Sequence, residues 1–232
     1  MNERRVRGRP CSGVNRRVGA GARAPLPIGR AARGFARCLS VTAGLLLFRR
    51  IHLPTDNRGL RVVFADTTSA CVFRETVVDR PAALAPCVLM VKFRLRAVHG
   101  RGHALFRRES LLNTVLFAGF PGLVSKLWLA HDQRGAYRGL YEWDGPAAAE
   151  TYALTLWRVL ALVSVPGSID YRVLPRIHRA DLFETIPRDD PHATGAEWWR
   201  VTGVVPPGGC VSREEGQSAT IEHTAGDGGR DD

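Results

Sequence analysis

The side chains best suited to chemistry gather in one stretch, KLWLAHDQRGAYRGLYEWD, at residues 126–144. Trp128 and Tyr141 carry an indole N–H and a phenolic O–H, which can donate hydrogen bonds to charge that develops on a bound molecule. Buried Trp and Tyr also commonly satisfy these groups on backbone carbonyls while they fill a core. The residue types therefore leave two interpretations open: aromatic side chains that line a ligand cavity, or a packed core.

Groups able to move protons are few. His99 and His103 lie in the sequence HGRGH, where His103 is either a general base or a solvated loop histidine. Glu142 is a candidate buried carboxylate for acid/base work if it faces Ser125, and pairing with a nearby Arg is the alternative. These residues make up the predicted acid/base set.

Several kinds of site are missing from the sequence. It contains no H-E-x-x-H, no clustered Cys and His, no phosphate-binding glycine loop beyond a lone G-x-G, and no G-x-S-x-G. His131 and His178 are poorly placed for an axial haem ligand. The five cysteines are scattered with no C-x-x-C, so we expect free thiols. The sequence therefore predicts neither a metal site nor a cofactor.

These residues must be positioned by a small set of regular elements. Alternating apolar and polar residues predict strands at 88–97 and 168–174. The turn sequence HDQRG, with Gly135, predicts a hairpin of two strands at 123–130 and 136–143. Helical spacing predicts helices at 103–118 and 146–164, the second with Asp144 as its N-cap. The order β-α-β-β-α-β is the ferredoxin-like arrangement, an α+β sandwich with a four-stranded antiparallel sheet.

The flanking segments carry weaker secondary-structure signals. Residues 61–78 read as a hairpin, 180–184 as a short helix and 197–204 as an edge strand. We predict a disordered Arg-rich leader over 1–58, one domain over 59–204 with its core at 86–176, and a disordered tail over 205–232. The apolar run 38–48 is too short to span a bilayer as a helix, and we expect a cytoplasmic protein.

The net charge of +11 comes from the leader. Residues 1–50 hold twelve Arg and one acidic residue, so the remaining residues carry equal numbers of basic and acidic side chains. A tail charge of this kind is weak evidence for nucleic-acid binding or for binding to an anionic membrane. We expect neither as a partner.

Symmetric pairing about the HDQRG turn assigns the hairpin residues to two faces. One face carries the pairs Trp128–Gly139, Lys126–Tyr141 and Val124–Trp143, and the other carries Leu127–Leu140, Leu129–Arg138 and Ser125–Glu142. The leucine face suits the helices. The aromatic face, together with Lys92, Arg94 and Arg96, would then be uncovered, and a second copy of the chain is its expected cover. A homodimer is therefore predicted.

A ferredoxin-like domain that dimerises through its open sheet face resembles the dimeric α+β-barrel superfamily. Within it, GFPGLVSKLWLAHDQRGAYRGLYEWDGP (119–146), a helix and VPGSIDYRVLP (165–175) resemble the YdhR-like monooxygenases over roughly 86–176. The superfamily includes cofactor-free quinone-forming monooxygenases, haem-binding proteins, polyketide cyclases and modules without known activity. The resemblance thus covers the arrangement of elements better than the chemistry.

The resemblance implies a cofactor-independent monooxygenase that acts on a small aromatic or polyketide-like molecule. The alternative is a non-catalytic dimeric module that binds a small apolar or aromatic ligand. For the enzyme, the predicted catalytic residues are His103, Tyr141 and Trp128. The predicted ligand-binding residues are Trp143, Lys126, Arg96, Glu142 and Ser125.

Overall fold

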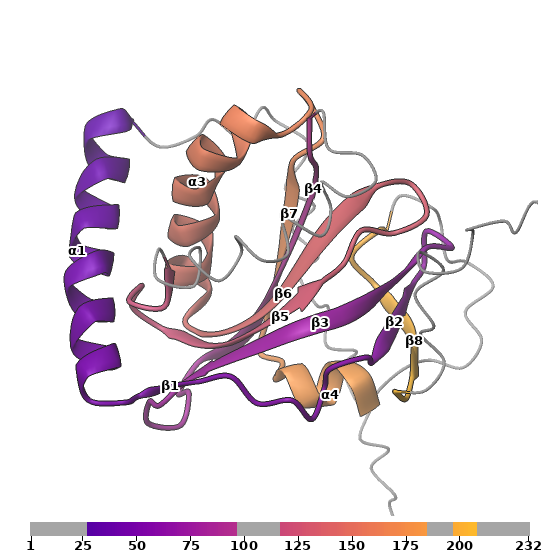
Figure 1. The fold of residues 1–232 in the computed structure, drawn as a ribbon, viewed down its shortest axis with the longest axis horizontal. Coiled ribbons are helices and arrows are strands. Elements are labelled where there is room, and N and C mark those ends of the chain that lie inside the picture. Colours follow the sequence, from indigo (N-terminus) through magenta and orange to yellow (C-terminus); the bar gives the residue numbers. More distant parts are fainter. Residues whose placement is uncertain (1–26, 97–116, 185–196, 208–232) are drawn as a thin grey trace, which may run out of the picture.

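The computed structural model describes residues 27–96, 117–184 and 197–207. Within these ranges the helices are α1 (Ile28–Leu47), α3 (Pro146–Val163) and α4 (Arg179–Glu184). The strands are β1 (Ile51–His52), β2 (Arg61–Phe64), β3 (Ser69–Val78), β4 (Pro86–Arg94), β5 (Leu123–Leu129), β6 (Ala136–Asp144), β7 (Asp170–Pro175) and β8 (Val201–Val205). Figure 1 shows α1 and α3 side by side against the sheet, with α4 at its lower edge.

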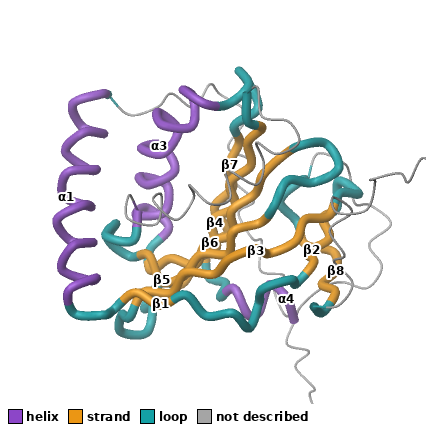
Figure 2. The backbone as a smooth tube through the Cα atoms, viewed as in Figure 1, coloured by secondary structure: helices purple, strands orange, loops and turns teal. Residues whose placement is uncertain are grey.

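The strands form one antiparallel sheet in the order β7-β4-β6-β5-β3-β2-β8, with β1 paired to β3. The first four strands in this order give the ferredoxin-like arrangement, because the second hairpin strand lies next to the first strand of the motif. The crossover from β6 to β7 runs through α3 (Figure 2). The α+β, ferredoxin-like class predicted from the sequence is therefore confirmed, although the predicted helix at 103–118 lies mostly outside the described residues.

One face of the sheet is covered by α1 and α3. We call it the helix-side face, and its buried core contains residues from both helices and from most of the central strands. On α3, the buried positions Ala149, Tyr152, Ala153 and Leu160 follow the helical repeat, so one stripe of this helix points at the sheet. The sequence forms a helix here because Pro146 occupies the first turn of an alanine-rich segment.

The opposite face is buried as well. We call it the far-side face, and its core is built from β2, β8, α4 and the alternate residues of the central strands, including Met90, Leu127, Leu140 and Trp198. β4 is consequently buried on both sides, with an unbroken run from Cys87 to Val91. The alternating residues of 88–97 predict a half-buried strand, with one face apolar and the other polar, and that prediction is wrong. Both cores belong to one chain.

The hairpin register is largely as predicted. Ser125–Glu142, Lys126–Tyr141, Leu127–Leu140, Trp128–Gly139 and Leu129–Arg138 are paired, and an irregularity before Ser125 places Leu123 rather than Val124 opposite Trp143. The assignment of faces is wrong. Trp128, Tyr141 and Trp143 lie on the helix-side face, and so do Leu89 and Val91 of β4.

The reversed faces remove the reason given for a dimer. The aromatic face is covered by the chain's own helices, so it offers no open surface to a second copy. Large aromatic side chains fill the gap between a sheet and its helices as well as they fill a gap between two sheets. Lys92, expected on the aromatic face, instead lies with its Nζ 4.6 Å from the centroid of the Trp198 ring.

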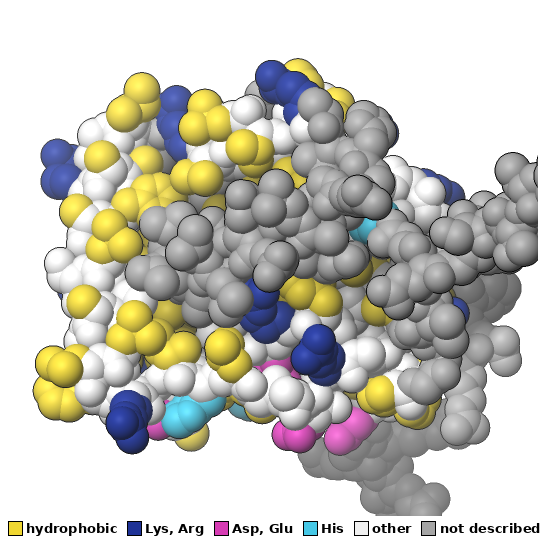
Figure 3. All heavy atoms as spheres, in the orientation of Figure 1, with side chains coloured by type: hydrophobic (Ala, Val, Ile, Leu, Met, Phe, Trp, Pro, Cys, Tyr) yellow, Lys and Arg dark blue, Asp and Glu magenta, His cyan; other side chains and the backbone are white. Residues whose placement is uncertain are grey.

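The N-terminal segment is a second correction, because residues 28–52 were expected to be disordered. They contain α1 and β1, with Cys38, Thr42 and Leu45 buried in the helix-side core. Figure 3 shows hydrophobic side chains over this part of the molecule. The outer side of α1 also retains exposed Leu39, Leu46, Leu47 and Phe48.

The structure also tests the predictions for the flanking elements, for Asp144 and for the cysteines. The 61–78 hairpin, the short helix α4 and the edge strand β8 are present. Asp144 does not cap α3, because Gly145 is the N-cap and the Asp144 carboxylate accepts the Ala85 N–H at 2.8 Å. Cys38 and Cys87 are buried free thiols, but Cys71 is disulfide-bonded, so the prediction of free thiols fails at that position. None of the described helices is long and apolar enough to cross a bilayer.

Candidate functional site

The helix-side face brings together two rows of residues that run across the sheet. Thr76, Lys126, Tyr141 and Leu89 are consecutive partners from β3 to β4. Arg74, Trp128, Gly139 and Val91 form the next row. Because alternate residues of a strand share a face, both rows point toward α1 and α3. They form the floor of the candidate site.

Lys126 stands at the centre of this floor and is only 3% exposed. Its Nζ lies 3.0 Å from the centroid of the Trp128 ring, 4.0 Å from that of Phe117 and 4.6 Å from that of Tyr141. Within the described parts of the chain no carboxylate forms an ion pair with it. A lysine buried without a counter-ion is rare in proteins, because desolvating an ammonium costs several kcal/mol.

The surroundings of Lys126 therefore favour the neutral amine. Burial lowers its pKa well below the usual 10.5, and repulsion from the Arg74 guanidinium lowers it further. The three ring faces act in the opposite direction, since each stabilises a cation by about 0.5–2 kcal/mol. With no carboxylate to assist them, we assign the larger effect to desolvation. A neutral lysine amine is a Brønsted base and a nucleophile.

Two tyrosine hydroxyls lie beside the lysine. Tyr152 of α3 donates to the Tyr141 oxygen at 3.4 Å, and the two rings meet edge to face. Burial raises the pKa of both phenols, so each keeps its proton at neutral pH. No acceptor for the Tyr141 proton lies within hydrogen-bond distance among the described residues. Tyr141 is thus placed as a donor.

The two indole N–H groups differ in their partners. Trp128 Nε1 donates to Thr76 Oγ1 at 3.3 Å, so its N–H is already engaged. Trp143 is fully buried, and its Nε1 has no hydrogen-bond partner in the described residues. Buried donors are nearly always paired, so an orphaned one is a place where a ligand oxygen could bind. Trp143 is therefore the better candidate donor, and Trp128 forms a wall of the site.

The missing side chain of Gly139 leaves room for the Tyr141 ring. A Cβ at position 139 would lie 2.6 Å from Tyr141 Cε2 and 2.9 Å from its hydroxyl oxygen. The tyrosine ring therefore lies across the backbone of Gly139, next to Trp128. Any larger residue there would push the ring away from Lys126.

The aromatic cluster, which we define as Phe117, Lys126, Trp128, Tyr141, Trp143 and Tyr152, thus contains four of the predicted site residues. The other four are elsewhere. Glu142 and Ser125 project to the far-side face, where Glu142 pairs with His178 Nδ1 at 2.8 Å instead of an Arg. Arg96 is exposed and donates to the Ser164 carbonyl at 3.0 Å. His103 lies outside the described residues.

Sequence reasoning missed Arg74, Thr76 and Phe117. The segment that contains Arg74 and Thr76 was predicted as a strand, but nothing local indicated that β3 would extend the sheet beside β5. Alternation of Arg74, Thr76 and Val78 is the signal that assigns them to one face. The helical spacing of 146–164 predicts that Tyr152 lies on the apolar stripe of this helix, but nothing in the sequence indicates its contact with Tyr141.

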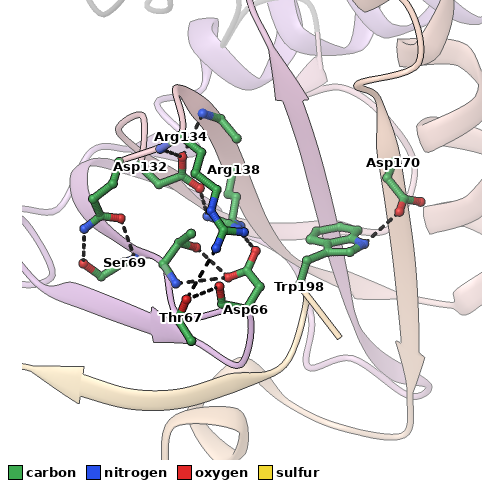
Figure 4. A network of polar contacts seen from close by, with 11 residues as sticks. Asp66, Thr67, Ser69, Asp132, Arg134, Arg138, Asp170 and Trp198 are labelled. Carbon is green, nitrogen blue, oxygen red and sulfur yellow. Dashed lines mark hydrogen bonds and ion pairs between the residues drawn. The ribbon is translucent and has the colours of Figure 1, made fainter. Parts of the chain in front are cut away.

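A second polar cluster lies at the other end of the hairpin. The buried Arg138 donates to Asp132 at 2.5 Å and to Asp66 at 2.7 Å (Figure 4). Its guanidinium carbon also lies 4.2 Å from the centroid of the Phe64 ring. Asp66 also accepts from Thr68, and Asp132 from the backbone N–H of Ala136. The carboxylates are occupied by protein donors, so the cluster joins the β2–β3 turn to the β5–β6 turn as a structural clamp.

The described residues offer no metal site, since no three His, Cys, Asp or Glu among them are grouped to bind an ion. The chemistry available in the aromatic cluster is thus that of an amine, two phenols and an indole. These groups can remove a proton, attack a carbonyl and stabilise an oxyanion.

Comparisons with known proteins give only distant likenesses. No protein-family model matches this sequence, and no curated protein is significantly similar to it. An uncharacterised ferredoxin-fold protein related to antibiotic biosynthesis monooxygenases, from Listeria monocytogenes, is 13% identical with a TM-score of 0.36, over 47% of this chain and 64% of that one. An anthrone oxidase-like protein is 14% identical with a TM-score of 0.33, over 48% and 55%.

The chain thus spans less than two thirds of either protein. At these TM-scores the likenesses carry no argument about activity. The ferredoxin-like class rests on the strand order of the sheet itself.

Proposed function

We propose that the protein is a cofactor-independent monooxygenase that acts on a small aromatic or polyketide-like molecule, with Lys126 as its general base. The observation that supports this proposal is the burial of the Lys126 amine among three aromatic rings, with no carboxylate partner in the described part of the chain. Flat aromatic substrates stack well on such rings. The amine would replace His103 as the base predicted from the sequence.

The chemistry requires a substrate with an acidic C–H or phenolic O–H. Lys126 Nζ would take this proton, and the resulting anion would reduce dioxygen. One oxygen atom enters the product as a carbonyl and the other leaves as water, so a methylene group becomes a ketone. Proton removal by a positioned base contributes typically about 10²–10⁴-fold to such a rate.

Two donors would hold the developing oxyanion. Tyr141 retains its proton, and Trp143 Nε1 has no partner among the described residues. Both are carried by β6 two residues apart, so they point from the same face of one strand. Donors that are fixed before reaction stabilise charge more effectively than water does.

Oxygen uptake tests the proposal. The purified protein is mixed with anthrone and with a panel of hydroxynaphthalenes, and oxygen consumption is followed with product analysis by mass spectrometry. We expect consumption above the spontaneous rate for at least one compound. Lys126→Met should reduce kcat by about 100-fold or more, in the range of a lost general base.

The chain supplies a matched control, since Lys92 and Lys126 are its only lysines. Lys92 lies on the far-side face, so Lys92→Met should leave kcat unchanged. Equal loss in both variants, or no uptake with any compound, would contradict the proposal. A Soret band that is shifted and sharpened relative to that of free haem, after addition of haem, would point to a haem-binding protein instead.

The alternative is a non-catalytic module that binds a small apolar or aromatic ligand. Close ring packing favours it, because Tyr152 contacts Phe120, Tyr141 and Trp143 with centroid distances of 5.2, 5.4 and 4.9 Å, like an ordinary core. Native mass spectrometry separates the two functions. Retention of a panel compound without oxygen uptake supports the module.

The homodimer and the cytoplasmic location stay predictions. A dimer would need a surface other than the aromatic face, which α1 and α3 cover. Sedimentation equilibrium would give the oligomeric state directly.

A further inference from the structure

We propose that the Lys126 amine also forms imines with small, flat aldehydes, using the rings of Phe117, Trp128 and Tyr141 as the walls of the binding site. This activity shares Lys126 with the proposed oxygenase but needs no oxygen, so either can fail alone. Three features support this proposal: the position of the amine, the charges that face it and the residue types around it.

Among the described residues, Lys126 has neither of the usual environments of a lysine. A surface lysine is solvated and a buried one normally pairs with a carboxylate. The contacts of Lys126 Nζ are instead with ring faces, at 3.0, 4.0 and 4.6 Å from their centroids. An amine held in this way keeps its lone pair when it is neutral, and lysines desolvated in apolar sites are the ones that form Schiff bases.

The groups that face Lys126 also disfavour its charged form. Arg74 of β3 brings a guanidinium to 5.7 Å from the Trp128 ring, the same ring that Lys126 touches. A neighbouring cation activates a lysine nucleophile. The remaining titratable groups of the cluster, Tyr141 and Tyr152, are phenols that stay protonated and bring no negative charge.

The rings set the class of carbonyl compound. Three ring faces surround the nitrogen, and no residue of the aromatic cluster carries a negative charge. In the proposed complex an aromatic aldehyde stacks on one of these rings while its carbonyl carbon meets Nζ. Phosphorylated or carboxylated carbonyl compounds do not require aromatic rings for binding, so the rings favour an aromatic aldehyde.

The covalent step balances with the groups present. Nζ attacks the carbonyl carbon, the C–N bond forms, and the carbonyl oxygen takes a proton from the Tyr141 hydroxyl, which regains one from the positively charged Nζ. The second Nζ proton then passes to the carbinolamine hydroxyl by the same route, the hydroxyl leaves as water, and the C=N bond of the imine forms. Amine and aldehyde thus become imine and one water, with no change of oxidation state.

Reductive trapping tests the proposal. The folded protein is treated at neutral pH with benzaldehyde and sodium cyanoborohydride, which reduces an imine to a stable benzylamine. Trypsin does not cleave at the modified lysine, so labelling of Lys126 yields the intact peptide 109–134. Because the neutral amine is the reactive form, and burial lowers the pKa of Lys126 more than that of Lys92, we expect Lys126 to be labelled at least several-fold more than Lys92.

Three controls make the result decisive. In denaturant both lysines should be labelled equally, which corrects for their intrinsic reactivity. Benzyl alcohol, which has the ring but no carbonyl, should reduce labelling of Lys126 alone. Tyr141→Phe should slow labelling of Lys126 several-fold while that of Lys92 is unchanged. Benzylation of Lys92 and the N-terminus but not of Lys126, in protein with an unchanged circular dichroism spectrum, would overturn the proposal.

Discussion

Lys126 and Tyr141 are direct partners across the β5–β6 ladder, and the lysine Nζ lies 4.6 Å from the centroid of the tyrosine ring. This pair places a base and a protonated phenol on the same face of the sheet, under α1 and α3. Its consequences can be measured without knowing the substrate, because a buried amine changes the pH dependence of folding.

The stability of the protein should rise with pH because of Lys126. The pKa of the folded-state amine lies well below 10.5, so between these two values the unfolded chain binds a proton that the folded chain does not. The free energy of unfolding then increases by up to about 1.4 kcal/mol per pH unit in this window. Lys126→Met should remove most of the increase in urea titrations at successive pH values.

Lys92→Met is the control for this slope. Burial also lowers the pKa of Lys92, but less strongly, and Asp170 and Asp132 act in the opposite direction. Its removal should leave most of the slope in place. A slope that survives Lys126→Met and disappears with Lys92→Met would show that Lys126 is charged in the folded protein.

Gly119→Ala should destabilise the protein by undocking α1. A Cβ at this position would lie 2.1 Å from the Cys38 carbonyl oxygen and 2.8 Å from the Thr42 backbone nitrogen, and neither backbone atom can move alone. We expect a loss of about 1–3 kcal/mol, as for other overpacked contacts, read from chemical denaturation.

Gly44→Ala is the matched control, because Gly44 lies on α1 with nothing within 4 Å of an added Cβ. It should be neutral or stabilise the helix by up to about 1 kcal/mol. If Gly119→Ala is as harmless as Gly44→Ala, then α1 does not pack against the Phe117–Phe120 turn as described.

Arg138→Met should cost about 3–5 kcal/mol, because it leaves Asp66 and Asp132 buried without their cation. Arg134→Met, four residues earlier in the same turn, removes an exposed side chain with a 3.5 Å contact to Thr67 and should cost less than about 0.5 kcal/mol. Thermal unfolding of the two variants measures the difference. Similar costs would mean that the clamp contributes little beyond an ordinary surface arginine.

Much of the fold could be predicted from the sequence because its signals are local. The HDQRG turn and its glycine Gly135, with a positive φ of 73°, define the hairpin and its register. The helical stripe of α3 and its Pro146 define the second crossover. These features depend on neighbours in sequence, so one chain is enough to recognise them.

The orientation of the sheet could not be predicted in the same way. Both faces of β4 and β5 are apolar, so hydrophobicity alone does not tell which face receives the helices. The arginine-rich composition of the N-terminal segment also concealed α1, whose buried side is short and interrupted by Thr42. The wrong assignment of the faces also affects the site. Lys126 was predicted to bind a ligand on an open face, whereas it is enclosed on a covered one.

The charge state of Lys126 is best tested by ¹⁵N NMR of the lysine side chains. Lysine labelled at Nζ gives only two signals, from Lys92 and Lys126, and each can be assigned with its Lys→Arg variant. We expect the Lys126 signal to change from ammonium to amine well below pH 10.5 in the folded protein, and both signals to titrate together in denaturant. A Lys126 ammonium that persists up to about pH 10.4, the value of an unperturbed lysine, would contradict the assignment of Lys126 as base and nucleophile.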